Sequence, residues 1–262
     1  MTMKKLFYYS TAIFSIFIST SYAQLENKKI IDLSYPFDSL TIFWPTETGF
    51  QLNTEFKGTT DKGYHYEANT FCSPEHGGTH MDAPAHFYAN RPTVDKVPLE
   101  SLIGNAIVID VSNKCMDNRD YLVSIQDFMD WETKNGQIKT GTIILLKTGL
   151  GKYWPDRIKY MGTNERGKEA VKKLHFPGLD PKAATWLVDT RKIKAVGIDT
   201  PSIDFGQSTL FETHVILTEH MVPIFENVAN MNLLPTKSFS IIALPMKIAG
   251  GSGAPLRIIA LL

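Results

Sequence analysis

The chain has 262 residues, of which 43% are hydrophobic and 21% charged, as in an ordinary globular protein of one large or two small domains. Its 27 basic and 27 acidic residues balance. No overall field would therefore attract nucleic acid or an anionic membrane, and we expect the partner to be a small molecule.

Residues 1–23 have the organisation of a secretory signal peptide. Lys4 and Lys5 precede an uncharged, apolar and hydroxyl-rich stretch, which ends in Ser21-Tyr22-Ala23 with small residues where a signal peptidase cleaves. An uncleaved anchor is the alternative, but about 17 apolar residues diluted by hydroxyls are short for a membrane span. We expect a secreted or periplasmic chain that begins at Gln24 and has no membrane partner after cleavage.

The segment His76-Gly-Gly-Thr-His80-Met-Asp82-Ala-Pro-Ala-His86 holds three of the seven histidines of the chain. Three imidazoles and a carboxylate in eleven residues indicate a metal site or proton-transfer chemistry. The alternative is a polar loop whose histidines form ordinary hydrogen bonds. Thr79 either donates a hydrogen bond to the carboxylate or imidazole of a metal ligand, without binding the metal itself, or is an ordinary β-branched strand residue.

This segment is predicted to be extended. Gly77, Gly78 and Pro84 each oppose a helix, although His76 and His80 have the spacing of a helical metalloprotease motif. On a strand, His80 and Asp82 share a face, and the glycines let the chain bend so that His76 joins them. These three side chains would form a first shell for a zinc- or manganese-like ion.

Residues 24–262 are predicted to form one mixed α/β domain. Runs rich in Ile, Val and Leu predict strands at 29–33, 106–111, 142–147, 193–198, 239–244 and 257–262. Ser124, with Asp127 three residues on, predicts a helix through about residue 131. Asp180-Pro181 predicts a second helix over about 183–189, and a third is expected over 208–220. Helix-then-strand order favours parallel pairs, with antiparallel pairs left open.

Two further features allow alternatives. Residues 153–178 lack periodicity and are either a lid or binding loop or a solvated surface excursion. Cys72 and Cys115 are either disulfide-bonded or buried free thiols, and Cys72 is a weaker candidate for a metal ligand.

A second polar cluster lies between residues 211 and 228. Most of its charged residues, including Glu212, Glu219 and His220, are expected on the surface. Glu226 differs because it follows Pro-Ile-Phe, and a carboxylate in an apolar run must find a cation or a donor. Together with His214 it is a candidate for further metal ligands. No Gly-x-Ser-x-Gly elbow or phosphate-binding glycine loop is present, which disfavours a serine hydrolase and a nucleotide enzyme.

The segment from His76 to Phe87 resembles the signature of the cyclase family of metal-dependent hydrolases, which includes kynurenine formamidases and isatin hydrolases. Further segments are similar to other family blocks: 42–45, 197–204, 214–227 and 251–257. The resemblance implies a single-domain swivelling β/β/α fold with a mixed sheet, and a homodimer or larger homo-oligomer. Kynurenine formamidases of the family are typically cytoplasmic, so the signal segment argues against a role in tryptophan breakdown.

The resemblance also assigns roles to individual residues. His76, His80 and Asp82 match the ligands of a first metal, and Asp82 would bridge to a second ion held by His214 and Glu226. Because Glu226 is present, two Zn²⁺ are favoured over one Mn²⁺. The remaining matches are a catalytic histidine, His86, and an aromatic residue that packs against the substrate ring, Trp44. Phe87, next to His86, is a further candidate for substrate binding.

These residues predict a hydrolase that cleaves an amide bond of a small aromatic molecule with metal-activated water. The substrate would be an arylformamide such as N-formylkynurenine or a cyclic amide such as isatin. His86, with an ordinary pKa near ~6.5, suits proton transfer from water to the leaving nitrogen. Two alternatives remain: a secreted metal- or ligand-binding protein without turnover, and a cyclase or dehydratase that uses the same centre.

Overall fold

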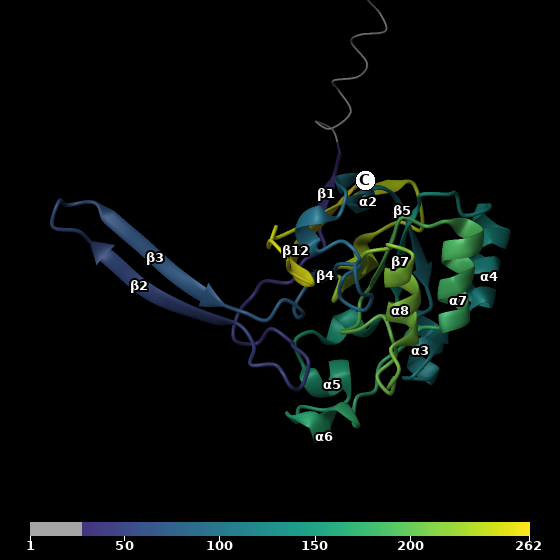
Figure 1. Ribbon diagram of the computed structural model, residues 1–262, viewed down its shortest axis with the longest axis horizontal. Helices are drawn as coiled ribbons and strands as arrows, with labels where there is room; N and C mark the ends of the chain where they lie inside the picture. Colours follow the sequence, from purple (N-terminus) through teal and green to yellow (C-terminus); the bar gives the residue numbers. More distant parts are fainter. Residues whose placement is uncertain (1–27) are drawn as a thin grey trace, which may run out of the picture.

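A closed barrel of seven strands forms the centre of the computed structural model, which describes residues 28–262 (Figure 1). The predicted signal segment lies outside the described residues. Around the barrel the strand order is β12-β11-β5-β7-β9-β10-β4, and β4 pairs with β12 to close the ring. The strands are β4 (His80–Asp82), β5 (Ile103–Asp110), β7 (Ile143–Lys147), β9 (Ala195–Ile198), β10 (Ile224–Glu226), β11 (Phe239–Pro245) and β12 (Gly253–Leu261).

The barrel is mixed, as predicted. The pairs β5–β7, β7–β9 and β9–β10 are parallel, whereas the pairs β10–β4, β4–β12, β12–β11 and β11–β5 are antiparallel. A further strand, β1 (Ile30–Asp32), pairs with the end of β12 outside the ring. All six predicted strands are present. The prediction placed the start of β12 four residues too late, because Gly253 and Pro255 are residues typical of a turn.

Alternate residues of the strands face two different cores. Inside the barrel, each of the seven strands contributes apolar side chains, among them Val108 and Leu145. The neighbouring residues, such as Ile109 and Leu146, face outward against the helices. Strands covered on both faces read as unbroken apolar runs, which is why the sequence identified them.

Helices α3, α4, α7 and α8 lie together on one side of the barrel (Figure 1). Their bounds are α3 (Ser112–Asp117), α4 (Ile125–Asn135), α7 (Pro181–Trp186) and α8 (Glu212–Glu219). The capping box of Ser124 and Asp127 is formed, and the Asp180 side chain accepts from Lys182 N at the start of α7. The prediction of a helix from residue 208 is wrong at its start. Phe211 adopts a left-handed conformation, with φ +51°, and α8 begins only after it.

Short elements connect these layers. They are α2 (Leu99–Leu102), α5 (Arg157–Met161), α6 (Lys168–Val171), β6 (Leu122–Val123), β8 (Gly178–Leu179), 3-10 turns at Val94–Lys96, Leu150–Tyr153 and Met231–Leu233, and a π turn at Leu187–Arg191. In the described part of the chain no helix is long and apolar enough to cross a membrane.

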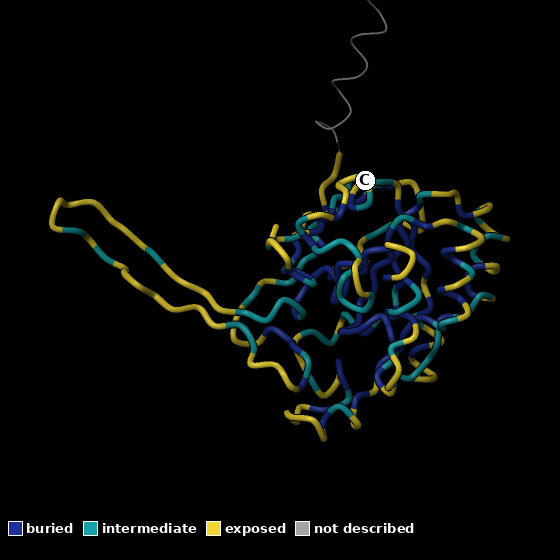
Figure 2. The backbone as a smooth tube through the Cα atoms, viewed as in Figure 1, coloured by how far each residue is buried: buried dark blue, intermediate teal, exposed yellow. Residues whose placement is uncertain are grey.

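A two-stranded arm projects from the body and was not predicted (Figures 1 and 2). It consists of β2 (Gln51–Thr59) and β3 (His65–Cys72), which pair with each other and with no other strand of residues 28–262. Almost all of its residues are exposed, so the apolar alternation that marks a buried strand is missing. Both cysteines are free thiols: Cys115 is buried, but Cys72 lies exposed at the end of β3, where burial was expected.

Candidate metal centre and substrate pocket

The register of three strands brings the first candidate ligands together. Strand β4 lies between β10 and β12, and His80 stands directly opposite Glu226 of β10. Paired residues of antiparallel strands point to the same face, as do residues two apart on one strand. His80, Asp82 and Glu226 therefore share one face, and all three are buried. The Nε2 atom of His80 is 3.3 Å from Asp82 Oδ1 and 3.4 Å from Glu226 Oε2.

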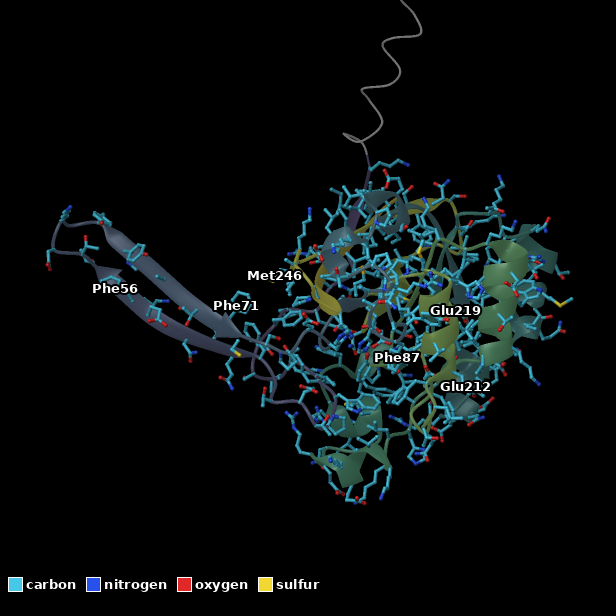
Figure 3. All side chains as sticks on the ribbon, in the orientation of Figure 1. Phe56, Phe71, Phe87, Glu212, Glu219 and Met246 are labelled. Atoms are coloured by element: carbon cyan, nitrogen blue, oxygen red, sulfur yellow. The ribbon has the colours of Figure 1, made fainter. Side chains whose placement is uncertain are left out.

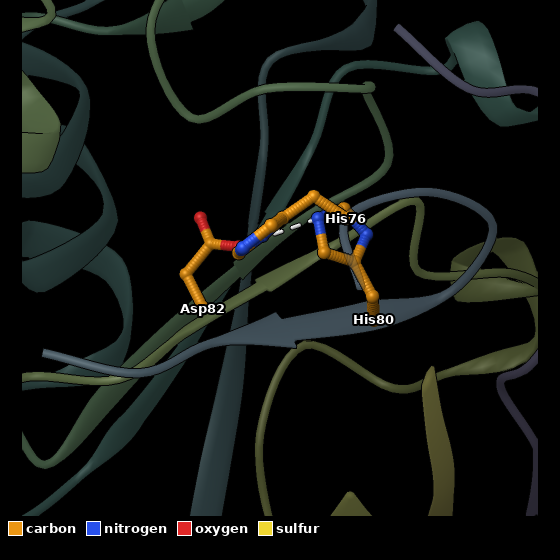
Figure 4. A group of neighbouring side chains, drawn as sticks. All are labelled: His76, His80 and Asp82. Atoms are coloured by element: carbon orange, nitrogen blue, oxygen red, sulfur yellow. Dashed lines mark hydrogen bonds and ion pairs between the residues drawn. The ribbon is translucent and has the colours of Figure 1, made fainter. Parts of the chain in front are cut away.

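The glycine pair before β4 makes the predicted bend. Gly78 has φ +55°, and a Cβ on it would lie 2.6 Å from the Phe37 ring. This bend places the Nδ1 atom of His76 2.7 Å from Asp82 Oδ1 (Figure 4). The extended geometry predicted for the segment is confirmed, and the helical alternative is excluded.

Helix α8 supplies His214 from the other side. Its Nε2 atom lies 3.2 Å from both Asp82 Oδ2 and Glu226 Oε1. The five predicted ligands thus form two groups that share Asp82: His76, His80 and Asp82, and Asp82, His214 and Glu226. Within each group the ligand atoms lie within 4.8 Å of one another.

Hydrogen bonds decide which nitrogen two of these imidazoles offer. His80 Nδ1 lies 2.9 Å from the carbonyl oxygen of Gly78, and His214 Nδ1 lies 2.6 Å from Asp204 Oδ2. A carbonyl and a carboxylate only accept, so both Nδ1 atoms carry the proton. Nε2, which faces the carboxylates of Asp82 and Glu226, is therefore the nitrogen that each of the two imidazoles could offer to a metal. Metal-ligating histidines typically donate their other ring nitrogen in this way.

The electrostatics of the centre favour positive charge. Burial and the neighbouring Asp82 carboxylate raise the pKa of Glu226. Burial also opposes a charged Asp82, but the surrounding imidazoles outweigh it and lower its pKa. For His80 and His214, burial disfavours the imidazolium, yet the carboxylates outweigh burial and raise both pKa values. Buried carboxylates that stabilise protonated imidazoles would also stabilise a divalent cation. This set of donors therefore fits the metal that the sequence predicts.

His86 lies next to the two groups without joining either. Its ring is stacked on His76 with centroids 3.7 Å apart, and its centroid is 6.1 Å from that of His214. Burial lowers the pKa of His86 to about 4; the Asp82 carboxylate opposes this shift, and the nearby His76, His214 and His80 add to it. At neutral pH the imidazole is therefore uncharged and free to accept a proton.

A pocket of about 210 Å³ opens above the ligands. Trp44 and Phe87, the two candidate substrate contacts, both line it, together with Phe43, Phe211, Ile42 and Pro201. Glu47, Ser202 and Asn227 are the polar lining residues besides the histidines and carboxylates of the centre. A few polar groups in an aromatic cavity suit a small aromatic ligand.

Residues 153–178 support one wall of this pocket. Arg157 Nη1 donates to the carbonyl of Phe43, and the amide of Gly167 donates to Pro45. The Trp44 ring meets the Phe176 ring edge to face, with centroids 6.4 Å apart. The segment therefore packs behind the pocket wall, although none of its residues lines the pocket, and its role as a lid or binding loop stays a prediction.

The predictions for the surface residues of the second polar cluster and for Thr79 have different outcomes. Glu212, Glu219 and His220 are exposed, as predicted. Thr79 is buried and bonds backbone: its hydroxyl donates to the Asn227 carbonyl and accepts from Tyr35 N. It does not reach a ligand side chain. The sequence analysis missed Asp204, which lies inside the block 197–204 but has no local pattern that points to His214.

The fold and this centre together define a class of protein. The solved structure of an isatin hydrolase A from Ralstonia solanacearum is similar to this one, with a TM-score of 0.81 and 26% identity. The match covers 100% of this chain and 99% of the isatin hydrolase chain. The Cyclase family model matches residues 31–205, and the chain belongs to that family.

Two relatives cover most of the chain. An isatin hydrolase of Roseibium aggregatum is 28% identical over 244 residues, which cover 86% of this chain and 90% of the relative. A kynurenine formamidase of Salinibacter ruber is 27% identical over 232 residues, which cover 87% of this chain and 95% of the relative. Both relatives are hydrolases by name.

The tight approach at Gly77 leads to a prediction about stability. A Cβ at this position would lie 2.0 Å from the ring of the buried Phe43, so the ring or the backbone would have to shift. We expect Gly77→Ala to lower the free energy of unfolding by about 1–3 kcal/mol, the usual cost of overpacking. Chemical denaturation measures the change. Gly58→Ala is the matched control because nothing lies within 4 Å of its Cβ. Equal stability of the two variants would contradict the packing argument.

Proposed function

We propose that the protein is a metal-dependent hydrolase that cleaves an amide bond of a small aromatic molecule. One observation carries the proposal: two ligand groups sharing Asp82 lie at an aromatic pocket, with an uncharged His86 beside them. The names of the relatives support an arylformamide such as N-formylkynurenine, or a cyclic amide such as isatin, as the substrate.

The ligand set favours two divalent ions. His76, His80 and Asp82 would hold one, and Asp82, His214 and Glu226 the other. Imidazole and carboxylate donors suit Zn²⁺ well, and a single Mn²⁺ is the alternative. When bound, a divalent ion supplies Lewis acidity, which activates water and polarises a carbonyl oxygen.

The residues of the chain do the rest of the chemistry. Trp44 and Phe87 hold the aromatic ring and exclude bulk water from the amide. His86 takes a proton from the attacking water as the new C–O bond forms, and returns it to the nitrogen as the C–N bond breaks. The low pKa of His86 makes the protonated imidazole a strong acid toward that nitrogen and the neutral imidazole a weak base toward water.

The decisive experiment combines metal analysis with a variant of His86. We expect protein purified without added metal to contain zinc or manganese and to hydrolyse N-formylkynurenine or isatin. His86→Ala should keep the metal and lower kcat by about 10²–10⁴-fold, the usual contribution of a proton-transfer residue. His220→Ala, at an exposed histidine, is the control. A fully active His86→Ala would exclude the role of His86, and wild-type protein without metal or turnover would exclude the hydrolase.

We further propose that residues 1–23 direct export and are then removed. The basic start, the apolar stretch and the small residues at Ser21 and Ala23 support this. In a bacterial host that exports the full chain, mass spectrometry should find mature protein beginning at Gln24 outside the cytoplasm. Cytoplasmic protein that retains Met1–Ala23 would contradict the proposal.

We also propose that the active form is a homodimer joined through the β2–β3 arm. A lone two-stranded hairpin is marginally stable in water, yet this one exposes Phe56 (41%), Tyr66 (52%) and Leu52 (60%). Phe56 and Tyr66 form one cluster, with ring centroids 5.7 Å apart. Apolar side chains exposed in this way typically mark an interaction surface.

A second copy of the chain offers a fitting surface. A groove of the body is lined by Phe37, Leu244, Met246 and Pro255, and Leu244 and Met246 are about half exposed. Met246 lies on the side of the body from which the arm leaves (Figure 3). A two-fold axis would let each arm cover the groove of the other copy, which gives a closed dimer.

Replacement of the aromatic cluster tests the dimer. We expect wild-type protein to have the mass of a dimer by light scattering, and the double variant F56S and Y66S to have the mass of a monomer. The control is the double variant T54S and N69S, in the same arm. A monomeric wild type, or a dimeric F56S and Y66S protein, would contradict the proposal.

A further inference from the structure

The block Gly251-Ser252-Gly253 contacts the first ligand of the candidate centre. It leads into β12, which starts at Gly253, and its Ser252 lies 176 positions from His76 in the sequence. The Ser252 hydroxyl lies 2.9 Å from His76 Nε2 and 2.7 Å from Glu75 Oε2. The same carboxylate oxygen accepts from the backbone amides of Ser252, at 2.9 Å, and Gly253, at 3.3 Å.

The available protons decide which group donates in each of the hydrogen bonds between His76, Ser252 and Glu75. A hydroxyl has one proton, and a carboxylate that accepts from two amides can only accept. Ser252 therefore donates to Glu75, and its oxygen accepts the proton of His76 Nε2. The lone pair of His76 is left on Nδ1, which faces Asp82 Oδ1 at 2.7 Å. His76 thus offers Nδ1 to the centre, whereas His80 and His214 offer Nε2.

Both glycines make room for these contacts. A Cβ on Gly253 would lie 2.4 Å from Cε1 of His76, and one on Gly251 would lie 2.7 Å from Glu75 Oε1. Gly253 stands opposite Asp82 in the β12–β4 pair, so the ring of His76 occupies the place of a side chain there. The serine holds the ring, and the glycines allow it to approach the strand.

His76 is held differently from the other two imidazoles. His80 is fixed by a carbonyl of its own segment, and His214 by the buried Asp204. The support of His76 crosses to another strand and ends at Glu75, whose side chain is 31% exposed. Because His86 stacks on His76, the same support also sets the plane on which His86 rests.

We propose that Glu75 and Ser252 are positioning residues that orient His76 and so set the metal affinity of the group His76, His80 and Asp82. This inference rests on the proposed metal-dependent function. Partners that orient a ligating histidine from behind typically contribute 10–100-fold to metal affinity. The group containing His214 and Glu226 has its own support in Asp204, so it should respond less, and only through the shared Asp82.

Metal titration of the full-length protein tests this inference. Zn²⁺ affinity is measured by competition with a chromophoric chelator, and Co²⁺ absorption spectra report on the geometry of the ligands. The ion whose signal disappears in His76→Ala identifies the first group. We expect Ser252→Ala to weaken that ion about 10–100-fold and to change its cobalt spectrum. Glu75→Ala should act in the same direction, and Glu75→Gln less, because its amide oxygen still accepts.

Two controls keep the result specific. Ser240→Ala removes a hydroxyl of β11 that bonds only Asn105, and it should leave both signals unchanged. Asp204→Ala should weaken the other ion instead. If Ser252→Ala fails to fold by circular dichroism, the partly exposed Glu75→Ala decides the result.

The outcomes separate the two proposals. Wild-type zinc affinity in Ser252→Ala and Glu75→Ala, with loss in His76→Ala, would overturn the positioning role and leave the metal-dependent function intact. Wild-type protein that binds neither Zn²⁺ nor Co²⁺ would overturn both.

Discussion

Two carboxylates, Asp82 and Glu226, are buried against the same imidazole nitrogens, and most features of the site follow from this constraint. A buried carboxylate needs opposite charge or hydrogen-bond donors to remain ionised. Here His80 and His214 each contact both carboxylates within 3.4 Å, and Ile203 N donates to Glu226. Replacing an imidazole would leave uncompensated charge in the interior, which is strongly destabilising. Chemistry and stability therefore depend on the same side chains.

The position of this cluster explains the topology around it. Strand β4 has only three residues, yet it is the strand that pairs with both β10 and β12 and closes the barrel. Two ligands lie on β4, one on β10, and the support of a fourth lies at the start of β12. A cation bound here would join the three strands at the seam. Any ligand that binds only the folded state stabilises it by mass action, so metal binding and barrel closure would be linked.

Sequence patterns predicted the parts of this arrangement that depend on local physics. Apolar runs identified the strands, Asp180-Pro181 identified the start of α7, and the glycines with Pro84 excluded a helix at His76. Three features depend on contacts between distant segments and leave no local pattern. Asp204 meets His214 only because the turn before α8 folds back, and Ser252 meets His76 only through the β12–β4 register. The arm lacks the apolar alternation of a buried strand, and its exposed aromatic residues would be accounted for by contact with a partner.

The shared ligand makes the two metal groups unequal rather than independent. Asp82 belongs to both, so the first cation to bind neutralises the carboxylate on which the second depends. The group with His214 rests on buried supports, Asp204 and the backbone of Ile203. The group with His76 rests on a serine and a partly exposed glutamate. A support open to solvent is weaker because water competes for its hydrogen bonds. The first group should therefore exchange its ion more readily, and this is also the group on which His86 stacks. The side of the site that would carry the proposed proton transfer is thus the side whose support lies partly at the surface of the protein.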